Sequence, residues 1–333
     1  MIERLLKGNV LVTGGAGYIG SHTVLALKEN GWGVIVLDDL STGNASMLPS
    51  DVPLIEGDIA DKELVLHILQ SCNCIAVLHF AGSIVVSESV SNPTKYYRNN
   101  TLGTLNLIEA CLESNLHSFI FSSTAAVYGN PTKVPVQEND PTIPINPYGQ
   151  SKLMVEQILK DVAHATPLRY GILRYFNVAG ADPQGRIGQC TPNATHLLKV
   201  TCQAVLNEEK KISVFGNNYN TPDGTCVRDY IHVSDLANAH VNVLEYLIQN
   251  KQSCLFNCGY GHGFSVAEVL QKVQEVSGTK LNITQAPRRA GDPAALIADS
   301  SKLRTTTGWQ PQYDNLSLII ETALNWEKEL LTL

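Results

Sequence analysis

A tyrosine and a lysine four residues apart, Tyr148 and Lys152, form the pair in this chain best suited to moving a proton. Pro147 can begin a helix, and residues four apart on a helix share a face, so the phenol and the ammonium would point the same way. Because a nearby cation lowers the pKa of a tyrosine from its usual value of about 10, we predict a tyrosine that takes a proton from an alcohol. The same spacing also occurs by chance on helix surfaces.

A run of hydroxyl residues, Ser122-Ser123-Thr124, ends an expected strand upstream of this pair. A hydroxyl at that place can hydrogen-bond the reacting oxygen and relay its proton, although serine and threonine also commonly cap strand ends. Together the run and the tyrosine pair favour proton transfer at an alcohol.

A glycine-rich loop at residues 13–20 lies between an expected strand at 9–13 and an expected helix at 21–30. Two glycine spacings overlap in it, through Gly15, Gly17 and Gly20 and through Gly14, Gly17 and Gly20. Glycines allow a tight turn and let a pyrophosphate reach the N–H groups at a helix N-terminus. The order strand, loop, helix is the context in which this otherwise weak pattern indicates a dinucleotide.

An acidic pair, Asp38 and Asp39, directly follows the next expected strand, at residues 34–37. A carboxylate at the position of Asp38 accepts from both ribose hydroxyls and repels a 2′-phosphate, so the sequence predicts NAD rather than NADP as cofactor. The positively charged nicotinamide ring would lower the pKa of Tyr148 further.

Two further segments follow expected strands and are candidates for the cofactor site. Asp58 and Ile59 come after the third strand, where Asp58 either meets the adenine edge or is an ordinary loop residue. Phe80, Ala81 and Gly82 come after the fourth strand, and small residues there let a cofactor pass close to the backbone.

The elements that must position these residues alternate between short apolar runs and helical stretches. Strands are expected at 9–13, 34–37, 54–56, 75–79, 118–122 and 169–174, and helices at 21–30, 62–69 and 102–114. This alternation predicts an α/β fold, a Rossmann doubly wound parallel sheet covered on both faces.

The composition changes near Asn177, after which glycine, proline and asparagine are frequent and one helix is expected, at 196–207. We predict an NAD-binding Rossmann domain at residues 1–176 with a return segment at 226–257. The remaining residues, 177–225 and 258–333, would form a smaller α/β lobe that binds substrate.

Composition is that of an ordinary globular protein, with 333 residues, 44% of them hydrophobic, and a net charge of -7. The negative charge gives no reason to expect nucleic acid or an anionic membrane as partner. The eight cysteines form no C-x-x-C pair and no histidine cluster accompanies them, so we expect reduced thiols and no metal site. With no long apolar run and no leader pattern, the expected location is the cytoplasm.

The chain resembles the extended short-chain dehydrogenase/reductases, and among them most closely the UDP-glucose 4-epimerase family. The resemblance runs nearly end to end. It rests on residues 12–22, 79–82, 88–90, 121–129, 148–157, 174–177, 224–233 and 288–292, which include the strings VTGGAGYIGSH, HFAG, FSSTAAVYG and GTCVRDYIHV.

This resemblance implies a reaction in which Tyr148, assisted by Thr124, takes the proton of a sugar 4-hydroxyl while the C4 hydride passes to bound NAD. The 4-keto sugar would turn over and receive the hydride on its other face. Lys152 would tune Tyr148 and hold the nicotinamide ribose. Cofactor contacts would come from Gly14, Gly17, Tyr18, Ile19, Gly20, Asp38, Asp39, Asp58, Ile59, Phe80, Ala81, Gly82, Asn99, Ser122, Tyr148, Lys152, Tyr175 and Phe176. Substrate contacts would come from Thr124, Tyr148, Asn177, Asn193, Leu197, Phe215, Arg228, Arg289, Asp292 and Leu296.

Three positions depart from the commonest pattern of that family. Thr124 replaces a serine but keeps the hydroxyl, and Ile84 stands where some members have a lysine near the cofactor. Leu296 occupies the position that gates the sugar pocket, where a tyrosine excludes N-acetyl groups and a small residue admits them. The leucine leaves open whether UDP-N-acetylglucosamine is accepted, and a UDP-glucuronate epimerase also stays open.

Other members of the fold family are disfavoured by two alanines. Nucleotide-sugar 4,6-dehydratases usually have Asp-Glu directly after the strand-end threonine, and glucuronate decarboxylases usually have a glutamate there, whereas this chain has Ala125-Ala126. A non-enzymatic NAD-binding regulator would usually lack the tyrosine or the lysine. The resemblance also implies a homodimer, in which the helices after Tyr96 and Tyr148 pack across a two-fold axis into a four-helix bundle.

Overall fold

The structure, a computed structural model, describes residues 7–192, 194–207, 209–289 and 292–332. Asn193, one of the expected substrate residues, lies outside the described residues. Within these ranges a seven-stranded parallel sheet runs in the order β11-β6-β5-β4-β1-β2-β3. Its strands are β1 (Asn9–Thr13), β2 (Gly33–Asp38), β3 (Leu54–Glu56), β4 (Cys74–His79), β5 (Ser118–Thr124), β6 (Arg169–Tyr175) and β11 (Cys254–Cys258). The predicted Rossmann sheet is confirmed.

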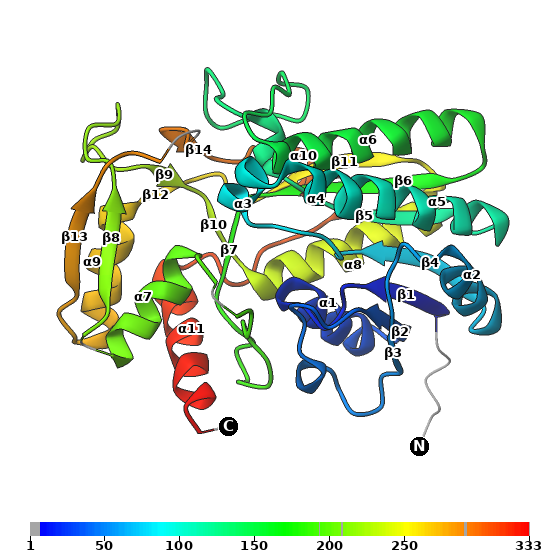
Figure 1. The fold of residues 1–333 in the computed structure, drawn as a ribbon, viewed down its shortest axis with the longest axis horizontal. Helices are drawn as coiled ribbons and strands as arrows, with labels where there is room; N and C mark the ends of the chain where they lie inside the picture. The colour runs from blue at the N-terminus through cyan, green and yellow to red at the C-terminus, as the bar shows by residue number, and fades with distance from the viewer. Residues whose placement is uncertain (1–6, 193, 208, 290–291, 333) are drawn as a thin grey trace.

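Helices cover both faces of this sheet (Figure 1). Helices α1 (Tyr18–Glu29) and α8 (Val233–Asn250) cover one face, and α2 (Lys62–Ser71), α5 (Gly103–Glu113) and α6 (Pro147–Ala165) the other. The alternation along β1 shows why: Val10 and Val12 belong to the core under α1 and α8, whereas Leu11 belongs to the core on the opposite side. A strand buried on both faces is apolar at every position.

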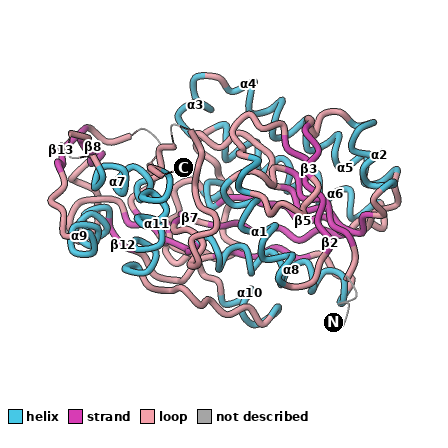
Figure 2. Tube along the Cα trace, turned by 90° about the horizontal axis from the view of Figure 1, so that it is seen from below, coloured by secondary structure: helices cyan, strands magenta, loops and turns pink. Residues whose placement is uncertain are grey.

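A smaller group of elements lies at one end of the molecule, on the left in Figure 1. Helices α7 (Leu197–Leu206), α9 (Val266–Ser277) and α11 (Leu316–Leu330) pack there beside the parallel pair β8 (Lys211–Phe215) and β13 (Asn282–Ala286). Figure 2 shows α7, α9 and α11 grouped at this end, away from the strands of the large sheet. The division of the chain into two lobes at the residues given above stays a prediction.

Short strands join the two groups. β7 (Asn177–Ala179) pairs with β10 (Tyr230–His232), and β9 (Val227–Arg228) lies between β12 (Phe264–Ser265) and β14 (Ala295–Leu296). The remaining helices are α3 (Val86–Ser91), α4 (Pro93–Tyr96), η2 (Tyr97–Leu102), α10 (Ser301–Thr307) and the single turns η1 (Ala45–Met47) and η3 (Ala125–Tyr128). Among the described helices, none is both long and apolar enough to span a membrane.

Helix boundaries differ slightly from the sequence expectation. Helix α1 begins at Tyr18 rather than at residue 21, directly after the glycine loop. The helix expected at 102–114 is α5, but the helical path already begins with α4 and continues through the π-helical turn η2. Periodicity alone does not find these starts, because Gly20 interrupts the apolar pattern in the first turn of α1 and α4 opens on Pro93, Thr94 and Lys95.

Candidate active site

The expected site residues follow strands of one parallel sheet, so they meet at its carboxyl edge. The register places Thr13 beside Leu37 and His79, and Thr124 beside Tyr175. The glycine loop, the acidic pair, Phe80 to Gly82 and the hydroxyl run therefore begin at neighbouring strand ends. In open α/β sheets this edge, near the point where strand order reverses, is where ligands bind.

The glycine loop is a tight cradle in which Gly14 and Gly20 have no room for side chains. Gly14 has a φ of +70°, and a Cβ on it would lie 2.4 Å from the Ala81 backbone nitrogen. A Cβ on Gly20 would lie 2.1 Å from the carbonyl oxygen of Gly14. Gly17 is the N-cap of α1 and supplies no side-chain acceptor, so the N–H groups of the first helical turn stay available to an anion.

Asp38 ends β2 beside this cradle and is almost completely buried. Its Oδ2 accepts from the Ala16 N–H at 2.9 Å and its Oδ1 from the Leu40 N–H at 2.9 Å, so the carboxylate is fixed while each oxygen keeps accepting capacity. Burial raises the pKa of Asp38, and these two N–H groups act against that rise. Asp39 is exposed and accepts from Ser41. The cradle and the buried acid together fit a dinucleotide with a free ribose 2′-hydroxyl.

The other expected cofactor residues lie at the same edge in different environments. Asp58 is exposed and accepts from the Ala60 N–H, whereas the side chain of Ile59 is part of the core under α2 and α5. Gly82 lies close to Lys152, since a Cβ on it would be 3.7 Å from Lys152 Nζ. Asn99 in η2 donates to Ser83 Oγ at 2.9 Å.

The structure brings Thr124, Tyr148 and Lys152 together. Helix α6 starts at Pro147, and the side chain of its N-cap, Asn146, accepts from the Gly149 N–H at 2.8 Å. Tyr148 in the first turn is buried and faces the end of β5, where the Thr124 hydroxyl is close enough to lower its pKa. One turn later Lys152 is also buried.

The pKa shifts of Tyr148 and Lys152 contradict one expectation from the sequence. Burial raises the pKa of Tyr148 above its ordinary value, and Lys152 is not among the groups that shift it. The lysine ammonium instead donates to the Ser122 carbonyl at 3.0 Å and lies 4.8 Å from the centre of the Phe121 ring. Burial lowers the pKa of Lys152 to about 8. The prediction that the lysine lowers the tyrosine pKa was therefore wrong for the protein alone, because desolvation outweighs the helical proximity of the two residues.

Sequence reasoning missed a buried ion pair that lies next to the residues expected to be catalytic. Glu156 on α6 binds Arg174 on β6, with the Arg174 Nε donating to Oε1 at 2.9 Å. Ser123, between Ser122 and Thr124, donates to the same carboxylate at 2.6 Å. The pair thus fixes the end of β5 against α6. No sequence signal could have found it, since the partners lie on different elements 18 residues apart.

Two arginines expected at the substrate are each held by a specific partner. Arg228 on β9 forms an ion pair with Asp292 and also donates to the Val227 carbonyl at 2.8 Å. The guanidinium carbon of Arg289 lies 3.8 Å from the centre of the Phe215 ring. Such an arrangement offers charge to a diphosphate and an aromatic face to a base.

A second stacked pair stands beside the first and was not expected from the sequence. The guanidinium carbon of Arg288 lies 4.0 Å from the Tyr219 ring centre, and Arg288 also donates to Asn218. Arg289 therefore lies against the last residue of β8, and Arg288 lies against Tyr219 in the segment that follows β8.

The remaining substrate candidates that the structure describes are Leu296, Asn177 and Leu197. Leu296 on β14 is the register partner of Arg228, and its side chain packs in one apolar cluster with Phe176 and Ala125. Ala125 directly follows Thr124, so the expected sugar gate shares an apolar cluster with the turn that follows Thr124. Asn177 follows Phe176 at the start of β7, and Leu197 begins α7.

Comparison with known proteins assigns this fold and site to a class. The model of the NAD dependent epimerase/dehydratase family matches residues 10–259, and the chain belongs to this family. UDP-glucose 4-epimerase of Azospirillum brasilense is 55% identical over 321 residues, which cover 96% of this chain and 92% of that protein.

Solved structures agree over the whole chain. The crystal structure of UDP-glucose 4-epimerase from Bifidobacterium longum in complex with NAD+ and UDP has a TM-score of 0.91 and 38% identity, covering 96% of this chain and 98% of that one. The UDP-Glc/GlcNAc 4-epimerase of Campylobacter jejuni has a TM-score of 0.84 and 48% identity, covering 97% and 99%.

Proposed function

We propose that this chain is an NAD-dependent UDP-glucose 4-epimerase, which interconverts UDP-galactose and UDP-glucose in galactose metabolism. The observation that carries the proposal is the convergence of Thr124, Tyr148 and Lys152 on the carboxyl edge of a sheet that also presents the glycine cradle and Asp38. Full-length relatives at up to 55% identity bear the same name.

NAD, when bound, would supply reversible hydride chemistry at C4 of the sugar. The residues that would hold it are those of the cradle, whose space and free N–H groups suit a pyrophosphate, and Asp38, whose oriented carboxylate suits ribose hydroxyls. Lys152 donates to the Ser122 carbonyl and lies near Gly82, and it would hold the nicotinamide ribose.

Tyr148 and Thr124 carry out the proton transfers. The Tyr148 oxygen takes the proton of the sugar 4-hydroxyl on the outward step and gives it back on the return step, with the Thr124 hydroxyl bridging the two oxygens. Because burial raises the pKa of Tyr148, its ionisation needs a positive charge nearby, which the nicotinamide ring of bound NAD would supply.

The nucleotide half of the substrate must stay fixed while the 4-keto sugar turns. Arg228 and Arg289 suit the diphosphate and Phe215 suits the uracil, with Asp292 holding Arg228 in place until substrate binds. Asn177 and Leu296 would face the sugar. Elimination of water is disfavoured because the turn η3 after Thr124 presents Ala125 and Ala126, which can neither donate nor accept a proton.

N-acetylated UDP-sugars are the second substrate class to test. Leu296 is smaller than a tyrosine and is almost buried in its apolar cluster, and the Campylobacter jejuni relative is named for both sugars. We propose that the leucine admits the N-acetyl group at reduced efficiency.

One assay tests these assignments together. Purified protein without added NAD is offered UDP-galactose and UDP-N-acetylgalactosamine in parallel, and the 4-epimers are separated by chromatography. Formation of UDP-glucose without net change in NADH absorbance supports the proposal. If no UDP-glucose forms even after NAD is added, the epimerase assignment is wrong.

We also propose that the protein is a cytoplasmic homodimer. Leu102 at the end of η2 is 51% exposed and Met154 on α6 is 38% exposed, and these two elements pack against each other. Apolar side chains on adjacent helices suit a two-fold four-helix bundle. Light scattering should give twice the chain mass, and Met154→Glu should give the monomer; a monomeric wild type contradicts the proposal.

A further inference from the structure

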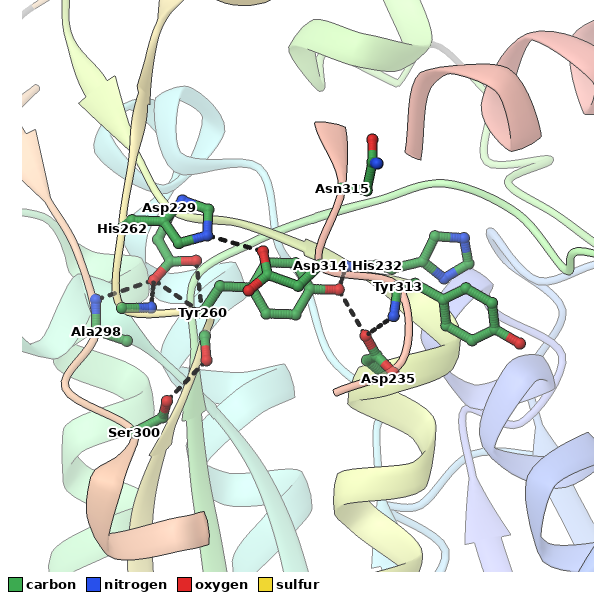
Figure 3. A network of polar contacts seen from close by, with 12 residues as sticks. Asp229, His232, Asp235, Tyr260, His262, Ala298, Ser300, Tyr313, Asp314 and Asn315 are labelled. Atoms are coloured by element: carbon green, nitrogen blue, oxygen red, sulfur yellow. Dashed lines mark hydrogen bonds and ion pairs between the residues drawn. The ribbon is translucent and has the colours of Figure 1, made fainter. Parts of the chain in front are cut away.

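Asp229, in the link between β9 and β10, is a fully buried carboxylate held by neutral donors. Its oxygens accept from the backbone N–H groups of Tyr260 at 2.9 and 3.1 Å, Gly261 at 3.0 Å and Ala298 at 3.2 Å (Figure 3). Burial raises the pKa of Asp229, and these N–H groups act against the rise. A carboxylate is costly to bury, so a role beyond filling space is needed to explain one here.

The main chain of Asp229 is bonded to two further segments. Its N–H donates to the Leu296 carbonyl at 3.2 Å, and its carbonyl accepts from the Asn177 N–H at 3.0 Å. Arg228 is its neighbour in the chain. One residue therefore joins β7, β9 and β14, the three strands that present Asn177, Arg228 and Leu296.

Each of these strands is short and pairs with its neighbours over only two or three residues. β14 and β9 share a register of two residues, Ala295 with Val227 and Leu296 with Arg228. So short a pairing is not stable on its own. The bond from the Ala298 N–H to Asp229 ties the segment after β14 to the residue next to Arg228, while the Val136 backbone bonds the same segment at Ile297 and Asp299. Asp229 thereby helps to set the distance between Leu296 and Arg228.

A second buried carboxylate provides a matched comparison. Asp235, in the first turn of α8, accepts from the Gln312 N–H at 2.8 Å, the Tyr313 N–H at 2.9 Å and the Tyr260 hydroxyl at 2.7 Å (Figure 3). It is as buried as Asp229 and equally without a cation among its hydrogen-bond partners in the described part of the chain. Yet it ties the segment before α11 to α8 and bonds none of the residues proposed to bind substrate.

We propose that Asp229 is a positioning residue of the substrate site, which sets the distance between the diphosphate-binding Arg228 and the sugar gate Leu296. This inference rests on the proposed function. It explains why a buried carboxylate stands directly after the arginine: three N–H groups from two distant segments, 260–261 and 298, need one acceptor with several lone pairs.

The test compares Asp229→Asn with Asp235→Asn in the full chain. Each amide keeps the shape but turns a donor towards N–H groups, so both variants should lose comparable stability. Asp229→Asn should raise the KM for UDP-galactose and the Kd for UDP, measured by calorimetry, about tenfold, with kcat within about threefold of wild type. Asp235→Asn should leave KM and Kd within about twofold. Asp229→Ser, which is smaller and cannot clash, should behave like Asp229→Asn.

Every other pattern overturns the inference. Unchanged KM and Kd in folded Asp229→Asn, or equal rises in both asparagine variants, would make Asp229 a general structural residue. Asp229 would also be a general structural residue if both of its variants failed to fold while Asp235→Asn folded. If wild type binds UDP but does not epimerise UDP-galactose, the proposed function fails, and the calorimetric comparison still decides the role of Asp229. A wild type that binds no UDP overturns both.

Discussion

The substitution Glu156→Gln removes the negative charge from an ion pair whose side chains are 0% and 2% exposed. Arg174 would keep a neutral acceptor but lose the charge that compensates its burial, and Ser123 would lose a strong acceptor. Breaking a buried pair from one side costs about 3–5 kcal/mol. With an unfolding entropy of about 2.1 cal/mol/K per residue, a chain of 333 residues should lose roughly 4–7 °C of melting temperature.

The assay is thermal and urea unfolding with NAD present at equal concentration throughout. Glu275→Gln is the control, because Glu275 pairs with Lys272 on an exposed helix face and its loss should leave the midpoint unchanged. The double variant Glu156→Gln, Arg174→Met should recover most of the loss, since it removes the uncompensated cation. A loss below about 1 kcal/mol in the single variant would refute the reasoning, as would a double variant less stable than the single one.

Three further predictions follow from the site and its burial. Tyr148→Phe should lower kcat about 10²- to 10⁴-fold while UDP still binds by calorimetry, and an unchanged kcat would place the base elsewhere. Leu296→Tyr should abolish turnover of UDP-N-acetylgalactosamine but keep that of UDP-galactose, as measured in parallel assays; equal losses for both sugars would argue against a gate. Burial lowers the pKa of His22, His232 and His240 to about 4, 3 and 4, so each stays neutral in the fold while the unfolded chain protonates it below about pH 6.5. The free energy of unfolding should therefore fall as the pH drops from 6.5, by up to about 2 kcal/mol for each histidine at pH 5. A urea midpoint that is unchanged between pH 7 and 5 would show that the three histidines are not buried as described.

The fold and the cofactor loop could be predicted because their signals are local. A strand, a glycine turn and a helix within residues 9–29 specify the cradle, and Asp38 ends the very next strand. The glycine loop and Asp38 are then expected to lie close together, because the carboxyl ends of parallel strands lie at one edge of the sheet. The Tyr148 and Lys152 pair is likewise a one-turn feature of a single helix.

What the sequence could not predict are interactions whose partners are far apart in the chain. Asp229 bonds residues 31, 32 and 69 positions later, and no spacing rule connects them. The sign of the Tyr148 pKa shift has the same origin. Tyr96 and Tyr175, from other elements, help to raise the pKa in the buried site, and a Y-x-x-x-K pattern reports only the proximity of the lysine.

Local sequence motifs and long-range interactions have different roles in this site. Local motifs supply the groups that react, and long-range networks decide their charge and spacing. Burial pushes Tyr148 towards its neutral form and Lys152 towards deprotonation, so the polypeptide around them opposes charge on both groups. The Glu156–Arg174 pair and the Asp229 bonds do not touch the reacting atoms, yet they fix β5, β9 and β14 against the elements that do. Variants of the motifs should therefore change kcat, and variants of the networks should change stability or KM.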